Sequence, residues 1–143
     1  MNPDAILWPA VALVGVTFVV WLRMYRTRIA AMREHKIHPQ AVATRAAVHE
    51  KMAVSPLAMQ SANNFENLFE LPVLFYALVA LLHQRSSVAA GFVAGAWLYV
   101  ALRAAHSYIQ CTYNKVMHRF TIYFASAWVL WLLWGAYAVS LAS

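Results

Sequence analysis

The sequence predicts an all-α integral membrane protein, a bundle of four transmembrane helices with a long first connection on the cytoplasmic side. Of its 143 residues, 63% are hydrophobic and only 11% are charged, whereas soluble domains carry about 25% charged residues. Four long apolar segments alternate with polar connections, and most basic residues are confined to those connections. This distribution of charge is typical of membrane proteins.

Each apolar segment is close to the length of about 20 residues that a helix needs to cross the hydrocarbon of a bilayer. The N-terminus runs into the first segment without the basic region of a signal peptide, so we expect this segment to be retained as a span. We treat residues 1–143 as a single membrane domain. The expected spans are residues 6–25, 61–82, 88–111 and 120–141.

The basic residues also predict the topology. Ten of the eleven Lys and Arg residues lie in or beside the first and third connections, and the second connection carries only Arg85. The positive-inside rule then places these two connections in the cytoplasm and both termini outside. Because the net charge of +6 arises from these connections, we expect no nucleic-acid partner. The bilayer itself is the expected partner.

A polar stripe opens the second span. Asn63, Glu66, Asn67 and Glu70 recur at helical spacing, so they share one face of the predicted helix. Pro72 follows and is expected to kink the helix, because it lacks a backbone donor. Ionised carboxylates at membrane depth are costly unless they find a cationic partner or water.

The third span carries a matching stripe and offers such partners. We expect Glu66 and Glu70 to meet Arg103 and His106 at similar depth, with Arg119 nearer the membrane surface. One interpretation is that the stripes only hold the bundle together. The other is a polar cleft, open to the cytoplasm, for a ligand with carboxylates and an ammonium group. The stripe consists of Arg103, His106, Ser107, Gln110 and Asn114.

This joint spacing resembles the MAPEG family, the membrane-associated proteins in eicosanoid and glutathione metabolism. The likeness rests on Asn63-x-x-Glu66 followed by a proline, on Arg103-x-x-His106, and on Arg119 sixteen residues after Arg103. It covers nearly the whole chain, including the long first connection. The sequence is identified as a divergent, bacterial member, which implies the inner membrane as its location and a site that faces the cytoplasm.

The resemblance implies a homotrimer with glutathione, the co-substrate, bound between subunits. The activity it implies is that of a glutathione transferase or peroxidase, in which an arginine-stabilised thiolate attacks lipophilic small molecules. Arg119 corresponds to the catalytic arginine, and one arginine of the first helix completes the site; we choose Arg26, with Arg23 and Arg28 as alternatives. The implied glutathione-binding residues are Asn63, Glu66, Arg103, His106, Gln110 and Arg26, and Asn67, Glu70 and Ser107 are further polar residues of the pocket.

Three positions depart from the family pattern. Met59 stands where the synthases usually carry arginine, Gln110 where they carry tyrosine, and Phe120 where the prostaglandin enzyme carries serine. A catalytically silent binding protein therefore remains an alternative. A small proton-coupled transporter is another, because such proteins use an intramembrane glutamate. We expect no metal site, since His35-x-x-His38 lacks a third ligand and is followed by Pro39.

Overall fold

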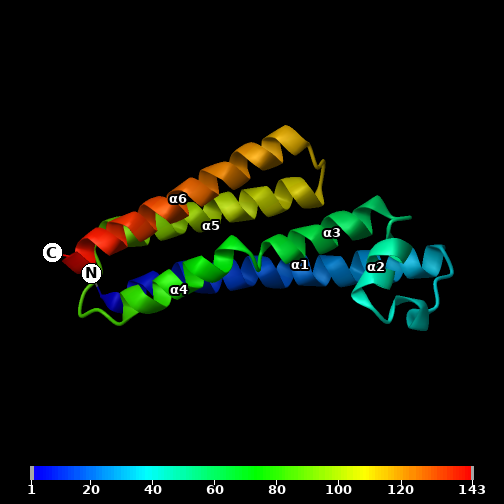
Figure 1. Ribbon diagram of the computed structural model, residues 1–143, viewed down its shortest axis with the longest axis horizontal. Coiled ribbons are helices and arrows are strands. Elements are labelled where there is room, and N and C mark those ends of the chain that lie inside the picture. The colour runs from blue at the N-terminus through cyan, green and yellow to red at the C-terminus, as the bar shows by residue number, and fades with distance from the viewer. Residues whose placement is uncertain (1, 143) are drawn as a thin grey trace.

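The computed structural model describes residues 2–142, and all regular structure in this range is helical, as predicted. Long helices run alongside one another, and the two ends of the chain lie at the same end of the molecule (Figure 1). Short 3-10 turns precede the first two helices, at Pro3–Ile6 and Pro39–Val42. The helices are α1 (Leu7–Glu34), α2 (Arg45–Met52), α3 (Pro56–Asn67), α4 (Leu71–His83), α5 (Ala90–Cys111) and α6 (Val116–Ala142).

Three helical segments are long and apolar enough to cross a membrane, namely Pro3–Glu34, Pro56–His83 and Val116–Ala142. The chain is therefore a membrane protein. Within the described residues α5 is not among these segments, although it is 22 residues long. Its second half contains Arg103, His106 and other polar residues, which lower its mean hydropathy.

The polar stripe of residues 61–82 does not lie on one continuous helix. α3 ends at Asn67, and α4 starts at Leu71 with Pro72 in its first turn. Glu70 occupies the N-cap position of α4, and its dihedral angles, φ −91° and ψ −104°, are not helical. The interruption lies where Pro72 was expected to distort the helix, because a proline ring excludes the continuous helical path at the preceding turn.

The first connection is more ordered than a loop. α1 continues to Glu34, nine residues beyond the expected end of the first span, and α2 then folds back over it (Figure 1). Thr44 caps α2 by accepting a hydrogen bond from the backbone of Ala47, and Ser55 caps α3 in the same way. A small core of Ala31, Met52 and Ala58 joins these three helices.

The main core lies in the half of the bundle nearer the termini. It includes Ile6, Leu13, Phe75, Tyr99 and Leu130, all at 0% exposure. Two polar contacts close this end. Asp4 Oδ1 lies 3.1 Å from His83 Nε2, and Arg85 donates to the hydroxyl and carbonyl oxygens of Ser140 at 2.6 and 3.2 Å.

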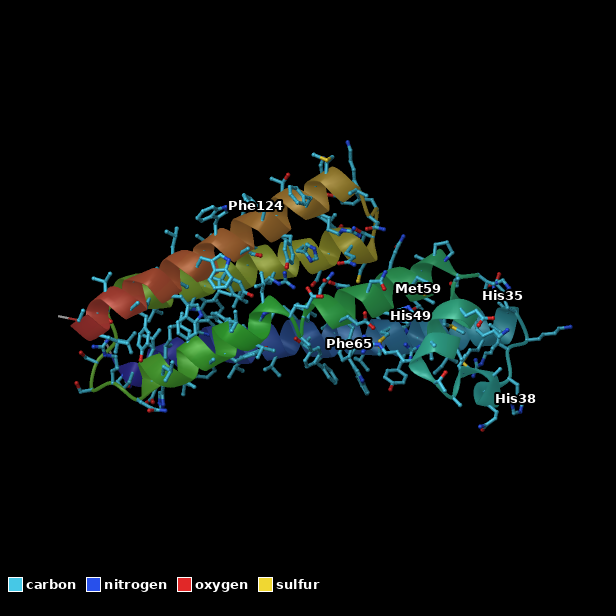
Figure 2. All side chains as sticks on the ribbon, viewed as in Figure 1. His35, His38, His49, Met59, Phe65 and Phe124 are labelled. Atoms are coloured by element: carbon cyan, nitrogen blue, oxygen red, sulfur yellow. The ribbon has the colours of Figure 1, made fainter. Side chains whose placement is uncertain are left out.

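The outer faces of the long helices are apolar, as expected for surfaces in contact with lipid. Phe124, for example, points outward from α6 and is exposed (Figure 2). Inside, α5 and α6 approach closely at Gly95, where an added Cβ would lie 2.7 Å from Leu133 Cδ2. Gly91, one helical turn earlier, has open space around it. Of these two glycines, therefore, only Gly95 is the small residue that lets α5 and α6 approach closely.

We predict that Gly95→Val destabilises the protein by about 1–3 kcal/mol, because the added methyl groups overpack the contact with Leu133. Gly91→Val is the matched control and should leave stability within about 0.5 kcal/mol. Thermal unfolding in detergent, followed by circular dichroism, measures both. Equal effects of the two substitutions would contradict close packing at Gly95.

Candidate functional site

The predicted site residues divide between two pockets on adjoining sides of α3. The first, which we call the α3–α5–α6 pocket, has a volume of about 320 Å³. It brings together five predicted residues from three helices, and none of its lining residues is acidic. They are Asn63, Asn67, His106, Gln110, Val116, Arg119, Phe120 and Tyr123.

Arg119 is held in this pocket by the turn that connects α5 to α6. Its Nη1 donates to Asn114 Oδ1 at 2.8 Å. Asn114 adopts a left-handed conformation, with φ 44°, which asparagine tolerates better than most residues. α5 ends at Cys111, so Asn114 does not continue the polar stripe as predicted; it orients the arginine instead.

Side-chain hydrogen bonds join α3 to α5 beside the pocket. Ser107 Oγ donates to Asn64 Oδ1 at 3.2 Å, and Asn64 Nδ2 lies 3.3 Å from Cys111 Sγ. Asn67 Nδ2 donates to Gln110 Oε1 at 3.3 Å. The predicted pocket residues Asn67, Ser107 and Gln110 thus serve the contact between the two helices. Asn64 takes part in two of these three hydrogen bonds. It was not among the predicted residues, because it lies one position after Asn63, outside the polar stripe predicted from the sequence.

Arg103 is fully buried behind the pocket. Its Nη2 donates to the backbone carbonyl of Asn67 at 2.7 Å, at the last residue of α3. Its guanidinium carbon lies 5.4 Å from the ring centre of Tyr123, which lines the pocket. A helix C-terminus carries partial negative charge, so it is a favourable partner for a cation. Nε and Nη1 of Arg103 have no hydrogen-bond partner among residues 2–142.

His106 lies beside Arg103 and is 2% exposed. Its ring centre is 5.6 Å from that of Tyr123. Its Nδ1 is buried without a hydrogen-bond partner in the described part of the chain. Buried polar nitrogens normally find partners, so the unpaired Nδ1 of His106, a residue that lines the pocket, marks a place where a ligand would complete the hydrogen bonding.

The predicted contact between Glu66 and Arg103 is wrong. Glu66 Oε1 pairs with Arg45 Nη2 at 2.6 Å and lies 3.7 Å from His49 Nε2. The physical reason is α2, which brings Arg45 and His49 over the side of α3 that carries Glu66. Of the two glutamates, Glu70 interacts electrostatically with Arg103.

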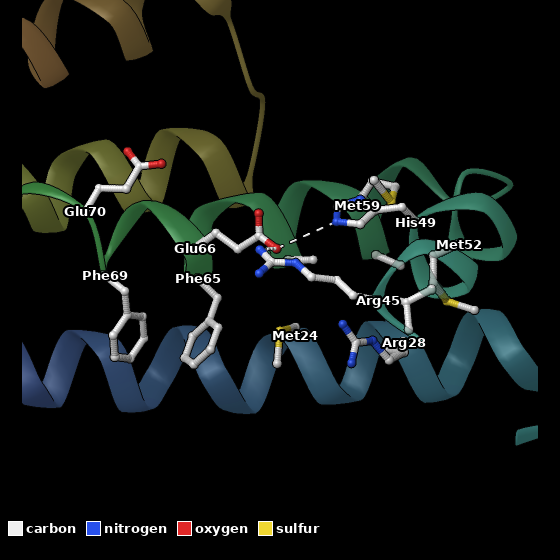
Figure 3. A pocket seen from close by; sticks show the side chains of 13 residues that line it. Met24, Arg28, Arg45, His49, Met52, Met59, Phe65, Glu66, Phe69 and Glu70 are labelled. Carbon is white, nitrogen blue, oxygen red and sulfur yellow. Dashed lines mark hydrogen bonds and ion pairs between the residues drawn. The ribbon is translucent and has the colours of Figure 1, made fainter. Parts of the chain in front are cut away.

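Glu66 and Glu70 belong to the second pocket, which we call the α1–α2–α3 pocket (Figure 3). Its volume is about 600 Å³, and basic, acidic and apolar side chains share its lining. The lining residues are Met24, Arg28, Arg45, Val48, His49, Met52, Ala58, Met59, Ala62, Phe65, Glu66, Phe69 and Glu70.

The three arginines of the first helix have different surroundings. Arg28 lines the α1–α2–α3 pocket, and Arg23 donates from Nη2 to the backbone carbonyl of Cys111. Arg26, the residue chosen from the sequence, is exposed and lines neither of these two pockets. Helical spacing placed all three near one end of α1 but did not say which sector of the helix faces the bundle.

The fold and the two pockets define an all-helical membrane protein with an arginine-rich polar site near one end of its bundle. The model of the MAPEG family matches residues 6–139 of the 143-residue chain, so the chain belongs to the MAPEG family. Searches of curated proteins and of solved structures gave no match to it.

We predict that Asn64→Ala lowers the free energy of unfolding by about 1–3 kcal/mol, because the buried hydroxyl of Ser107 loses its acceptor. Asn63→Ala, at the neighbouring exposed position, is the control and should change stability by less than about 0.5 kcal/mol. Chemical unfolding in detergent provides the measurement. If the two variants unfold alike, the hydrogen bonds between α3 and α5 contribute little.

Proposed function

We propose that this protein is a membrane glutathione transferase or peroxidase, with glutathione bound in the α3–α5–α6 pocket and Arg119 as the catalytic residue. Members of the MAPEG family generally use glutathione. The observation that carries the proposal is the composition of the pocket. It combines a polar, half-buried arginine with amide groups and an imidazole, and it contains no carboxylate.

The electrostatics of the pocket favour an anionic ligand. Arg119 lines it, and Arg103 lies behind Tyr123 at its wall. With no acidic side chain in the lining, the positive potential of these two groups is not cancelled locally. Amide groups of Asn63 and Gln110 offer donors and acceptors for a peptide backbone. These are the groups that a small peptide with two carboxylates requires.

Arg119 would act on the glutathione thiol. A thiol has a pKa above neutrality, and a guanidinium within hydrogen-bond reach stabilises the thiolate, the reactive form. The thiol proton leaves to water, and the sulfur lone pair forms a carbon–sulfur bond as the leaving group departs from the electrophile. With a peroxide, attack on oxygen releases an alcohol, and a second glutathione then yields the disulfide and water. Arginine keeps its own proton throughout.

The other predicted residues fit this proposal in different ways. His106 would hold an acidic group of glutathione through its unpaired nitrogen, and Arg103, behind Tyr123, would add positive potential at the same place. Glu66 and Arg26 contribute only if a ligand or a second subunit reaches beyond this pocket.

MAPEG proteins are generally trimers, and we propose a homotrimer in which exposed Arg26 faces a neighbouring copy. We further propose that α5 crosses the membrane as a fourth span, that both termini lie outside, and that the site faces the cytoplasm of a bacterial inner membrane.

Fewer observations support the two alternative functions, a transporter and a catalytically silent binding protein. A proton-coupled transporter needs an intramembrane glutamate without a fixed partner. Glu66 is paired with Arg45, so this role would fall to Glu70, which has no ion pair within 4.0 Å among residues 2–142. A catalytically silent binding protein would bind glutathione and show no turnover. The experiment below separates it from the enzyme.

We predict that Arg119→Ala lowers the rate of glutathione conjugation by about 10²–10³-fold, because a donor to the developing negative charge is lost. Conjugation to 1-chloro-2,4-dinitrobenzene, followed by absorbance, measures the rate, and thermal unfolding verifies that the variant is folded. Lys115→Ala, at an exposed position before the same helix, is the control and should keep full activity. Unchanged turnover in Arg119→Ala would refute the catalytic role, and absence of turnover in the unaltered protein would favour the silent alternative.

We also predict that Asn114→Gly reduces kcat about tenfold, with the KM of the electrophile unchanged. Glycine preserves the left-handed turn, so the substitution removes only the amide that holds Arg119. Lys36→Gly, at the other non-glycine position with positive φ within residues 2–142, is the matched control and should leave kcat unaltered. A wild-type kcat in Asn114→Gly would show that the turn does not position the arginine.

A further inference from the structure

We propose that Tyr113 and His118 form a positioning pair that keeps Arg119 directed into the α3–α5–α6 pocket. This inference rests on the proposed function, in which Arg119 is the catalytic residue, and it names two residues that act through that arginine. Tyr113 belongs to the turn between α5 and α6, at the end of the bundle away from the termini (Figure 1), and His118 belongs to the first turn of α6. Neither residue lines the pocket, so neither would touch the ligand.

Two side-chain contacts tie this turn to α6, and they run in parallel. Tyr113 Oη lies 3.3 Å from His118 Nδ1. Asn114 Oδ1 accepts a hydrogen bond from Arg119 Nη1 at 2.8 Å, so the two contacts are neighbours in the sequence at both of their ends. The rings of Tyr113 and His118 also meet edge to face, with centres 5.8 Å apart and an angle of 81° between their planes, an arrangement that aromatic pairs prefer. The first contact therefore supports the backbone that carries the second.

Electrostatic attraction alone does not hold Arg119 in place. It lies in the first turn of α6, and a helix N-terminus carries partial positive charge, which disfavours a cation. Lys115, whose carbonyl accepts from the backbone N–H of Arg119, adds a like charge one helical turn away. No carboxylate lies within 4.0 Å of Arg119 among residues 2–142. The amide of Asn114 is thus the one side-chain hydrogen-bond partner of Arg119 in the described part of the chain.

Asn114 depends in turn on the conformation of the turn between α5 and α6. Its φ of 44° is left-handed, a region that is unfavourable for most residues with a side chain. Toward α5 the turn is held by its backbone, since Asn114 N donates to Ile109 O at 2.8 Å. Toward α6 the described residues offer two side-chain contacts, and only that of Tyr113 with His118 is independent of Arg119. Loss of this contact would leave the turn held to α6 by the very arginine that it positions.

The expected consequence is a smaller fraction of molecules with the guanidinium directed at the thiol. A long side chain released from its partner samples several rotamers, and turnover falls with the fraction that is correctly placed. The binding of the electrophile is not altered, so its KM should not change. Because Tyr113 and His118 are both exposed, we expect an effect much smaller than that of Arg119→Ala.

Turnover of the full-length protein in detergent tests the proposal. Tyr113→Phe keeps the ring and removes the hydroxyl, so it should lower kcat for glutathione conjugation about threefold, as expected for one neutral hydrogen bond, with the KM of the electrophile unchanged. Tyr108→Phe is the matched control and should keep the kcat of the unaltered protein. Tyr108 is exposed, and its hydroxyl has no hydrogen-bond partner among residues 2–142.

Variants of the histidine separate positioning from general destabilisation. His118→Ala should lower kcat at least as much as Tyr113→Phe does. His118→Asn should retain the kcat of the unaltered protein, because an asparagine amide can take the place of Nδ1 as a partner for the tyrosine hydroxyl. The double variant Tyr113→Phe/His118→Ala should be no slower than His118→Ala alone, since both changes remove the same contact.

Chemical modification of Arg119 gives a measurement that does not require turnover. Phenylglyoxal reacts with accessible arginines, and mass spectrometry of the peptide that contains Arg119 reports the rate at this residue. Release of the side chain in Tyr113→Phe should raise this rate about threefold, in line with the loss of one hydrogen bond. Tyr108→Phe should leave the rate unchanged.

Two outcomes would overturn the proposal. One is a rate of modification at Arg119 that Tyr113→Phe does not alter. The other is a loss of kcat that Tyr108→Phe shares or that His118→Asn does not prevent. Faster modification of Arg119 with no change in kcat would support the positioning role and count against Arg119 as the catalytic residue. Absence of turnover in the unaltered protein would refute the proposed function alone, because the modification of Arg119 still decides whether the pair positions it.

Discussion

The bond from Arg103 to the carbonyl of Asn67 is the interaction on which both pockets depend. α3 ends before Pro72, and the carbonyls of its last turn lack helical partners. A fully buried guanidinium from α5 supplies a donor there, at the end of the helix that carries partial negative charge. The cation is thereby stabilised without a carboxylate within salt-bridge distance among residues 2–142. This contact fixes the end of α3 against α5, and so decides which side chains of α3 face α5 and which face α1.

The sequence predicted the fold class well because composition and charge distribution are properties of whole segments. The helices near the expected spans follow from hydrophobic periodicity, and the interruption follows from the backbone chemistry of Pro72. The gathering of Asn63, His106, Gln110 and Arg119 was implied by the resemblance to the MAPEG family. The pairing of Glu66 was not predictable in the same way. A helical stripe says which residues share a face but not which neighbour covers that face, and Arg45 comes from a short helix whose fold-back is decided by the tertiary contacts of Met52 and Ala58. The role of Asn114 depends on a left-handed turn, which nothing in the spacing indicated.

α3 acts as a partition between two electrostatic environments. On the side toward α5 and α6, arginine and amides surround a cavity without acids. On the side toward α1 and α2, two glutamates share the cavity with two arginines and a histidine. Because the partition is only one helix thick, Asn63 and Glu66 lie three residues apart yet line different cavities. A single helix can thus face two cavities of different charge, provided that its rotation about its own axis is fixed.

The two polar contacts near the termini hold one end of the bundle together. Asp4 with His83 and Arg85 with Ser140 close the end of the bundle that also contains the main aromatic and aliphatic core. At the opposite end, the α5–α6 pair diverges from α1 and α3 (Figure 1). Hydrogen bonds also join α5 to α1 and α3 at that end, from Arg23 to the carbonyl of Cys111 and from Arg103 to the carbonyl of Asn67. The two helix pairs are therefore tied together at both ends, so a motion that separates them must break polar contacts near the termini and buried ones near the cavities.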